Sequence, residues 1–162
     1  MMRKVFVLGF LLICLPALVF AQDRPTSKEA RRVIDYYYNA KGKGAILMDC
    51  KLCQEISEKG PEKYECKREI SDWKVKQGQE VFLWMNFLVP AGDKAEILLQ
   101  FRRKDKVRKV VPISLSGSPR YRTWKKIPTD KIGNWKVSIV QEMEDRDLDL
   151  GELEVSVVEA KP

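Results

Sequence analysis

Cys50 and Cys53 form a CxxC pair, a spacing that thiol–disulfide oxidoreductases use for reversible oxidation. Cys66 follows in the next predicted strand. If residues 45–53 form a β-strand, Cys50 and Cys53 lie about 10 Å apart and point to opposite faces, beyond the reach of a disulfide. The spacing therefore predicts a Cys53–Cys66 bridge between neighbouring strands, with Cys50 as a buried free thiol.

Three other uses of the thiols stay open: a Cys50–Cys66 bridge, redox chemistry at the CxxC pair, and metal binding. Three thiolates without a histidine make a poor zinc site, because the fourth ligand would have to be a carboxylate. Strand alternation places Cys50 on the core side of its strand. Its expected neighbours on that side are Ile46, Met48 and Leu52.

A second group of residues with possible chemistry is basic. Arg108 and Lys109 belong to a cationic hairpin, and Arg120, Arg122 and Trp124 follow on the next predicted strand. Cations with interleaved aromatic rings can bind phosphates and stack on bases, as in proteins that hold single-stranded nucleic acid. The plainer interpretation is a solvated hairpin whose charges keep its edge strands from pairing with other chains.

Five carboxylates form an acidic turn before the last predicted strand: Glu142, Glu144, Asp145, Asp147 and Asp149. Their oxygen atoms suit calcium, but the ligand spacing of the EF-hand loop is missing. We therefore expect neither a metal nor a cofactor. The turn is expected to be solvated, or to neutralise the basic hairpin of a neighbouring molecule.

The chain contains no histidine among its 162 residues. This excludes Ser-His-Asp and Cys-His catalysis, imidazole metal ligation and the CxxCH haem attachment motif. Chemistry by carboxylates alone, or by a Ser-Lys pair, survives in principle. The composition therefore favours a protein that is not an enzyme.

Residues 1–21 have the pattern of a secretory signal peptide. Arg3 and Lys4 precede an apolar run over 5–20. Val19 and Ala21 then supply the small residues expected at the −3 and −1 positions of a cleavage site. The run is shorter than the roughly 20 residues of a membrane-spanning helix. An exported protein rarely meets nucleic acid, so an anionic envelope polymer, lipid headgroups or an acidic protein is the expected partner of the basic residues.

Residues 22–44 are expected to form a short N-terminal helix and a linker. Thr26 and Glu29 make a capping box, in which each side chain bonds the other residue's backbone. Apolar residues then follow at helical spacing over about 13 residues. From residue 45 onward the apolar period changes to two, so residues 45–162 are expected to form one β domain.

Eight strands are predicted, near 45–53, 64–73, 79–89, 95–103, 107–115, 119–127, 134–143 and 150–158. Residues 81–89 are apolar on both faces, so that strand is expected to be central, with the helix over its second face. Seven or eight short antiparallel strands predict an all-β fold, an immunoglobulin-like β-sandwich. A small closed barrel is the competing solution.

Three motifs stand in order near the end of the chain: Arg122-Thr123-Trp124, Gly133-Asn134-Trp135-Lys136-Val137 and Leu153-Glu154-Val155. They resemble the bacterial family known as domain of unknown function 2914. The resemblance covers Ser116–Val157 and is weaker over 45–115; the acidic turn at 142–151 is longer than the family's usual glycine turn. The resemblance implies a sandwich-like architecture and a periplasmic location in a Gram-negative bacterium. It implies no catalytic residue.

The two tryptophans of these motifs also have a structural interpretation. Trp124 and Trp135 are expected to face inward on adjacent strands and fill the interior of the sandwich. Arg122 shares the strand face of Trp124 and could lay its stem across that ring.

Together these patterns predict an exported, non-enzymatic binding or interaction module of the cell envelope. Its partner is expected to be a protein or an anionic envelope component, with membrane contact peripheral at most. The expected ligand contacts are Arg108, Lys109, Arg120, Arg122 and Trp124. The alternatives are a thiol-redox protein that uses Cys50 and Cys53, and a structural component that assembles through exposed sheet edges.

Overall fold

The computed structural model describes residues 25–160, so the predicted signal peptide lies outside the described residues. The elements are α1 (Ser27–Asn39), β1 (Ile46–Ile56), β2 (Cys66–Glu69), β3 (Lys74–Lys76), β4 (Phe82–Arg103), β5 (Lys106–Lys126), β6 (Gly133–Glu142) and β7 (Asp147–Val158). Within residues 25–160, no helix has the length and apolar character needed to span a bilayer.

Helix α1 begins with the predicted capping box. The Glu29 carboxylate accepts a hydrogen bond from the Thr26 backbone amide at 2.7 Å, and the Thr26 hydroxyl accepts one from the Glu29 amide. These bonds from Thr26 hold the pKa of Glu29 below its usual value. None of the helix residues is buried. The helix is held to the body along one side, where the Tyr36 hydroxyl donates to the Gly44 carbonyl oxygen at 2.9 Å.

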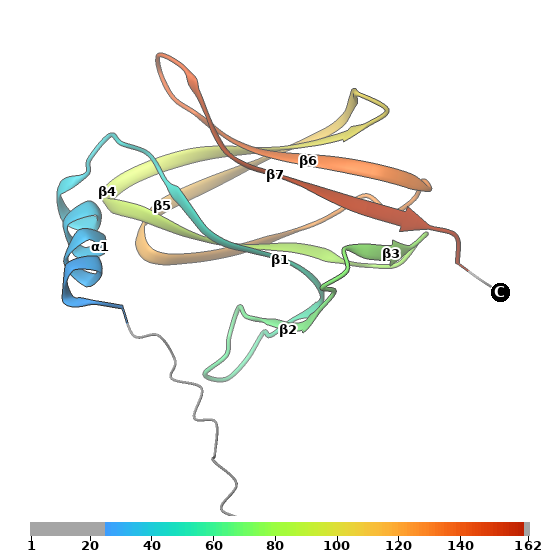
Figure 1. Cartoon of the computed structure of the whole chain (residues 1–162), viewed down its shortest axis with the longest axis horizontal. Coiled ribbons are helices and arrows are strands. Elements are labelled where there is room, and N and C mark those ends of the chain that lie inside the picture. The colour runs from blue at the N-terminus through green and yellow to red at the C-terminus, as the bar shows by residue number, and fades with distance from the viewer. Residues whose placement is uncertain (1–24, 161–162) are drawn as a thin grey trace, which may run out of the picture.

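All seven strands pair into one mixed sheet in the order β2-β1-β4-β6-β7-β3, with β5 beside β4. The neighbours are antiparallel, apart from β3, which runs parallel to β7. The sheet curls into a half-barrel (Figure 1). The expected β-rich fold with one N-terminal helix is confirmed. In place of the two separate sheets of a sandwich, however, the strands form one continuous curled sheet.

The curl arises because β4 and β5 fold over together as one long ribbon. The fold-over lies at residues 90–93 of β4 and 116–118 of β5, where the register between the strands shifts. Gly117 lets the backbones approach, since a Cβ there would lie 2.8 Å from both Pro90 O and Gly92 N. Each long strand therefore appears in the sequence as two short strands separated by a turn.

The fold-over divides β4 into a first arm (residues 82–89) and a second arm (residues 94–103). Along the edge opposite β5, the first arm pairs with β1 and the second with β6. The main core fills the concave side between the arms. Its fully buried members include Leu83, Met85, Phe87, Ile97, Leu99, Phe101, Val137 and Ile139.

The convex face of the first arm is covered differently from the sequence expectation. Trp84, which is 3% exposed, forms a second small cluster there with Cys53 and Ile56. The helix was expected over this face, and α1 does contact β4. At Trp84 itself, residues 57–65 supply a backbone contact. The Cys53–Cys66 disulfide belongs to this cluster and joins the end of the segment to β1.

Strand β1 contains a bulge that changes which of its side chains face the core. The register with β4 shifts between Leu47 and Asp49, so Met48 is an extra residue. Leu47 and Cys50 pack against the main core, whereas Met48 is 52% exposed and Ile46 is 37% exposed. The predicted core position is therefore correct for Cys50 and wrong for Ile46 and Met48. A rule of strict alternation cannot show that one residue has been inserted into a strand.

Candidate anion-binding site

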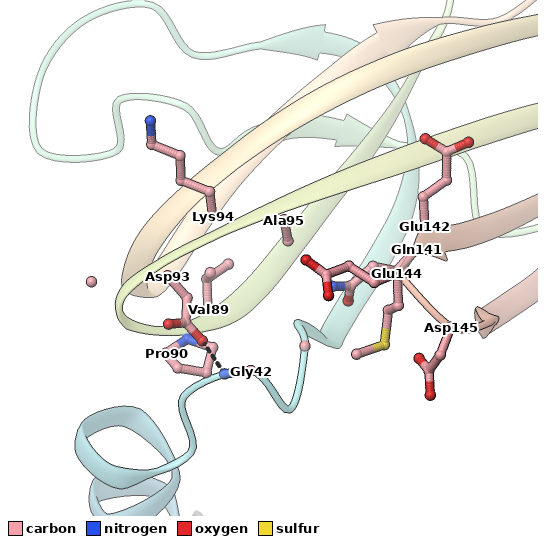
Figure 2. A pocket seen from close by; sticks show the side chains of 13 residues that line it. Gly42, Val89, Pro90, Asp93, Lys94, Ala95, Gln141, Glu142, Glu144 and Asp145 are labelled. Atoms are coloured by element: carbon pink, nitrogen blue, oxygen red, sulfur yellow. Dashed lines mark hydrogen bonds between the residues drawn. The ribbon is translucent and has the colours of Figure 1, made fainter.

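An acidic pocket of about 580 Å³ lies at the end of the half-barrel near α1 (Figure 2). The β4 fold-over and the β6–β7 turn line it, and the Gly42 amide donates to the Asp93 carboxylate at 2.8 Å. The side chains of Glu142 and Asp145 point in opposite directions (Figure 2). Across residues 25–160, no group of three or more candidate ligands converges as a metal ion requires.

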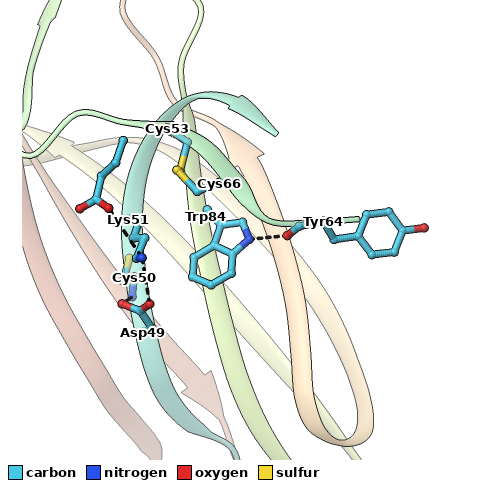
Figure 3. The surroundings of a disulfide bond; sticks show 8 residues. Asp49, Cys50, Lys51, Cys53, Tyr64, Cys66 and Trp84 are labelled. Atoms are coloured by element: carbon cyan, nitrogen blue, oxygen red, sulfur yellow. Dashed lines mark hydrogen bonds and ion pairs between the residues drawn. A yellow bond between two sulfur atoms is a disulfide. The ribbon is translucent and has the colours of Figure 1, made fainter. Parts of the chain in front are cut away.

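The predicted Cys53–Cys66 disulfide is present and joins β1 to β2, with the two Cα atoms 5.7 Å apart (Figure 3). The Cys50–Cys66 alternative is therefore wrong. Cys50 carries a free thiol, as predicted, and packs against the main core on the opposite face of β1 from Cys53. It is half-buried rather than fully buried.

Burial raises the pKa of the Cys50 thiol to about 12, with a smaller contribution from the negative charge of Asp49. Thiol–disulfide exchange and alkylation proceed through the thiolate. At neutral pH this thiol is therefore a poor nucleophile. The CxxC spacing brings no second thiol to it, because Cys53 is already bonded to Cys66.

We expect iodoacetamide at pH 8 to alkylate Cys50 in the native protein at least about a thousandfold more slowly than a free cysteine, because so little thiolate is present. Peptide mass spectrometry after timed quenching measures the rate. In denaturant without reductant Cys50 should react fully, whereas Cys53 and Cys66 should stay unlabelled. Rapid native labelling of Cys50 would contradict this assignment.

The segment from Ser57 to Glu65, termed here the 57–65 loop, lies over the convex face beside the disulfide. Trp84 Nε1 donates to the Tyr64 carbonyl oxygen at 2.6 Å (Figure 3). The Tyr64 ring lies 5.4 Å from the ring of Trp124. Trp124 is thus a convex-face residue partly covered by this loop, and its expected interior position is wrong.

Trp135, in contrast, occupies the expected interior position and is 4% exposed. The two tryptophans do not lie on adjacent strands, because β4 pairs with both β5 and β6 and separates them. Arg122 does share the convex face with Trp124, as predicted from strand alternation.

Arg120 and Arg122 are both engaged by one carboxylate. Glu65 Oε1 accepts a hydrogen bond from Arg120 Nη2 and another from Arg122 Nη1, each at 2.7 Å. Charge-assisted bonds of this kind are shorter and stronger than neutral ones. The two arginines therefore hold the end of the 57–65 loop, and their charges are partly neutralised within the molecule.

The turn between β4 and β5 lies at the opposite end of the half-barrel from α1 (Figure 1), and Arg108 and Lys109 follow this turn in β5. The register of β4 with β5 shifts between the Phe101–Lys109 and Arg102–Val107 pairs, so Arg108 is the extra residue of a bulge. Both cations line a pocket of about 690 Å³. The structure thus separates the predicted ligand contacts into two groups.

This pocket is basic. We call it the basic pocket and define it by Arg103, Arg108, Lys109, Lys126, Lys131 and Trp135. Lys126 is paired with Glu80 at 2.7 Å, and Asp130 is the one carboxylate in the lining. Among the described residues, no carboxylate oxygen lies within 4.0 Å of the cationic nitrogens of Arg103, Arg108, Lys109 or Lys131.

Arg103 and Lys131 were missed as candidate contacts. Arg103 could have been found, because strand alternation places it on the same face as Leu99 and Phe101, at the end of an inward-facing row. Its guanidinium lies 5.6 Å from the Trp135 ring, and Nη1 donates to the Ile132 carbonyl oxygen at 3.0 Å. Lys131 follows β5 in a connecting segment, where no periodic pattern marks it.

The arrangement can bind an anion, since four cations without a carboxylate partner surround one concave surface above a buried aromatic ring. The chain matches no protein-family model and no curated protein.

Proposed function

We propose that the protein is an exported, non-enzymatic binding module of the cell envelope that holds an anionic ligand in the basic pocket. The observation that carries this proposal is the convergence of Arg103, Arg108, Lys109 and Lys131 without an ion-pair partner among the described residues. Like charges that are held together and left uncompensated attract an anionic partner. Glu65 already serves the other basic group, at Arg120 and Arg122.

Export is supported by the Cys53–Cys66 disulfide, because disulfides persist in oxidising compartments and are rare in the cytosol. The signal-peptide pattern of residues 1–21 agrees with this compartment. The resemblance of Ser116–Val157 to the domain of unknown function 2914 family supports the periplasm of a Gram-negative bacterium. We also infer that the half-barrel is an open variant of the immunoglobulin-like sandwich, because the two arms of β4 enclose one core.

The thiol-redox alternative has less support, since Cys53 is bonded to Cys66 and the pKa of Cys50 is raised to about 12. The assembly alternative has one observation in its favour. Within the described sheet, β5 pairs only with β4, and its open edge exposes Val107 and Val110. Cations and Pro112 on the same strand discourage pairing with a second chain, so we favour ligand binding.

Charge reversal in the basic pocket tests the proposal. We expect Arg108→Glu/Lys109→Glu to lower retention of the protein on native envelope fractions by about tenfold or more, because attraction to an anion becomes repulsion. The wild-type protein should also be released as salt rises, since salt screens exposed charges. Sedimentation with envelope fractions, followed by immunoblotting, measures retention.

The matched control is Arg31→Glu/Arg32→Glu on the exposed side of α1, which changes the net charge equally, far from the pocket. This control should be retained like the wild type, and all three proteins should share one melting temperature. Unchanged retention of Arg108→Glu/Lys109→Glu, or equal loss in the control, would overturn the proposed function.

A further inference from the structure

The geometry points to a phosphate ester as the ligand group of the basic pocket, with Arg103 as its principal contact. This inference rests on the proposed function and specifies its ligand. Three features of the pocket support it: the unpaired Nε of Arg103, the number of cations without a carboxylate partner, and the size and apolar lining of the cavity.

Arg103 lines the pocket, and its buried Nε–H has no acceptor among the described residues. Nη1 donates to the Ile132 carbonyl oxygen, and the guanidinium plane lies near the Trp135 ring, but the buried Nε has no hydrogen-bond partner. A buried donor without an acceptor destabilises the rotamer that holds it. A small rotation toward an oxyanion in the pocket would satisfy Nε–H and present the planar fork that matches phosphate oxygens.

The charge around Arg103 suits a phosphate better than a single carboxylate. Arg108, Lys109 and Lys131 add three further cations, and Asp130 is the one opposing charge in the lining. A phosphate monoester carries up to two negative charges and has several acceptor oxygens. It can therefore engage a guanidinium and two ammonium groups together, whereas one carboxylate would leave most of these cations uncompensated.

The size of the pocket leaves room for the organic part of an ester. At about 690 Å³ it has the dimensions of a site for a small organic molecule. Ile127 and Pro128 line it beside Trp135, and Ile127 and Trp135 are buried core side chains. These apolar groups can cover the organic part of the ligand while the cations hold its phosphate.

Such a phosphate can come from a soluble ester or from a phospholipid headgroup, and two probes separate the sources. Glycerol 3-phosphate is titrated into the protein by calorimetry. Vesicles of phosphatidylcholine, with and without phosphatidic acid, whose headgroup is a phosphate monoester, are used in sedimentation assays. Saturable binding of glycerol 3-phosphate supports the inference with a soluble source. Binding confined to vesicles that contain phosphatidic acid supports it with a headgroup source. In either case Arg103→Lys must weaken the binding that is observed.

The decisive variant is Arg103→Lys, which keeps the charge and removes the fork. We expect it to weaken binding of the recognised probe by about tenfold, because an ammonium cannot replace paired guanidinium bonds. The matched control is Arg102→Lys on the other face of β4. The buried Nε of Arg102 also has no hydrogen-bond partner, but Arg102 does not line the pocket, so this variant should bind within about twofold of wild type. Lys131→Gln, at an exposed position, should also weaken binding. This variant keeps the test valid if the Arg103→Lys protein does not fold.

The inference fails if neither probe binds saturably. It also fails if Arg102→Lys weakens binding as much as Arg103→Lys and Lys131→Gln. If Arg108→Glu/Lys109→Glu abolishes envelope retention while both phosphate probes fail, the proposed function stands and the phosphate assignment is wrong. If that double variant is retained like the wild type, the proposed function itself is wrong.

Discussion

Replacement of Phe101 by alanine should lower the free energy of unfolding by about 3–5 kcal/mol, the largest effect expected for a single substitution in this protein. The Phe101 side chain is fully buried in the main core. Its backbone pairs with Lys109 of β5 on one side and with Val137 of β6 on the other. Removing the ring leaves a cavity that three hydrogen-bonded strands cannot collapse to fill.

Urea unfolding followed by circular dichroism measures this loss, with an unchanged slope against denaturant if folding stays two-state. The control is Val110→Ala on β5, where the side chain is 47% exposed. That substitution should stay within about 0.5 kcal/mol of wild type. A Phe101→Ala protein that loses less than about 1.5 kcal/mol would show that the main core is not organised around the second arm of β4 as described.

Removal of the disulfide should have the second-largest effect. We expect Cys53→Ala/Cys66→Ala to lose about 3 kcal/mol, because the bridge closes a short loop and reduces the entropy of the unfolded chain. The two cysteines are 13 residues apart in sequence. The 57–65 loop should also loosen, because only noncovalent contacts, such as the hydrogen bond of Trp84 to Tyr64 and the ion pairs of Glu65, then hold it to the sheet.

Scanning calorimetry with and without reductant checks this expectation. Reductant should lower the melting temperature of the wild type to near that of the double variant, and should leave the variant unchanged. Near-ultraviolet circular dichroism should change as well, since Trp84 and Trp124 both border the loop. A wild type whose melting temperature does not respond to full reduction would contradict a stabilising role for the bridge.

The covalent link was predictable from the sequence for a geometric reason. Alternation along a strand places Cys50 and Cys53 on opposite faces, so they cannot pair with each other and any bridge must reach Cys66. The structure decides that Cys53 forms that bridge. The predicted helix has the same local origin, because the capping box of Thr26 and Glu29 acts across three residues.

The strand arrangement was only partly predictable. Turn residues at 90–93 and 116–118 mark the places where the chain bends, and the sequence shows them clearly. Apolar and polar residues alternate in the same way whether a bend separates two strands of different sheets or two arms of one ribbon. The sequence pattern therefore does not distinguish a sandwich from one curled sheet. Close contact between Gly117 and the Pro90–Gly92 backbone keeps β4 and β5 paired through the bend, which yields one curled sheet.

The sequence by itself determined the residue classes and the features that depend on near neighbours: the helix cap, the turns and the opposite facing of Cys50 and Cys53. The tertiary structure alone decided which cations are free to bind. Glu65 reaches Arg120 and Arg122 from more than fifty positions away, whereas Arg108 and Lys109 meet Arg103 and Lys131 at the far end of the half-barrel. The physical reason is that the availability of a charge depends on its partners in space, and folding sets those partners.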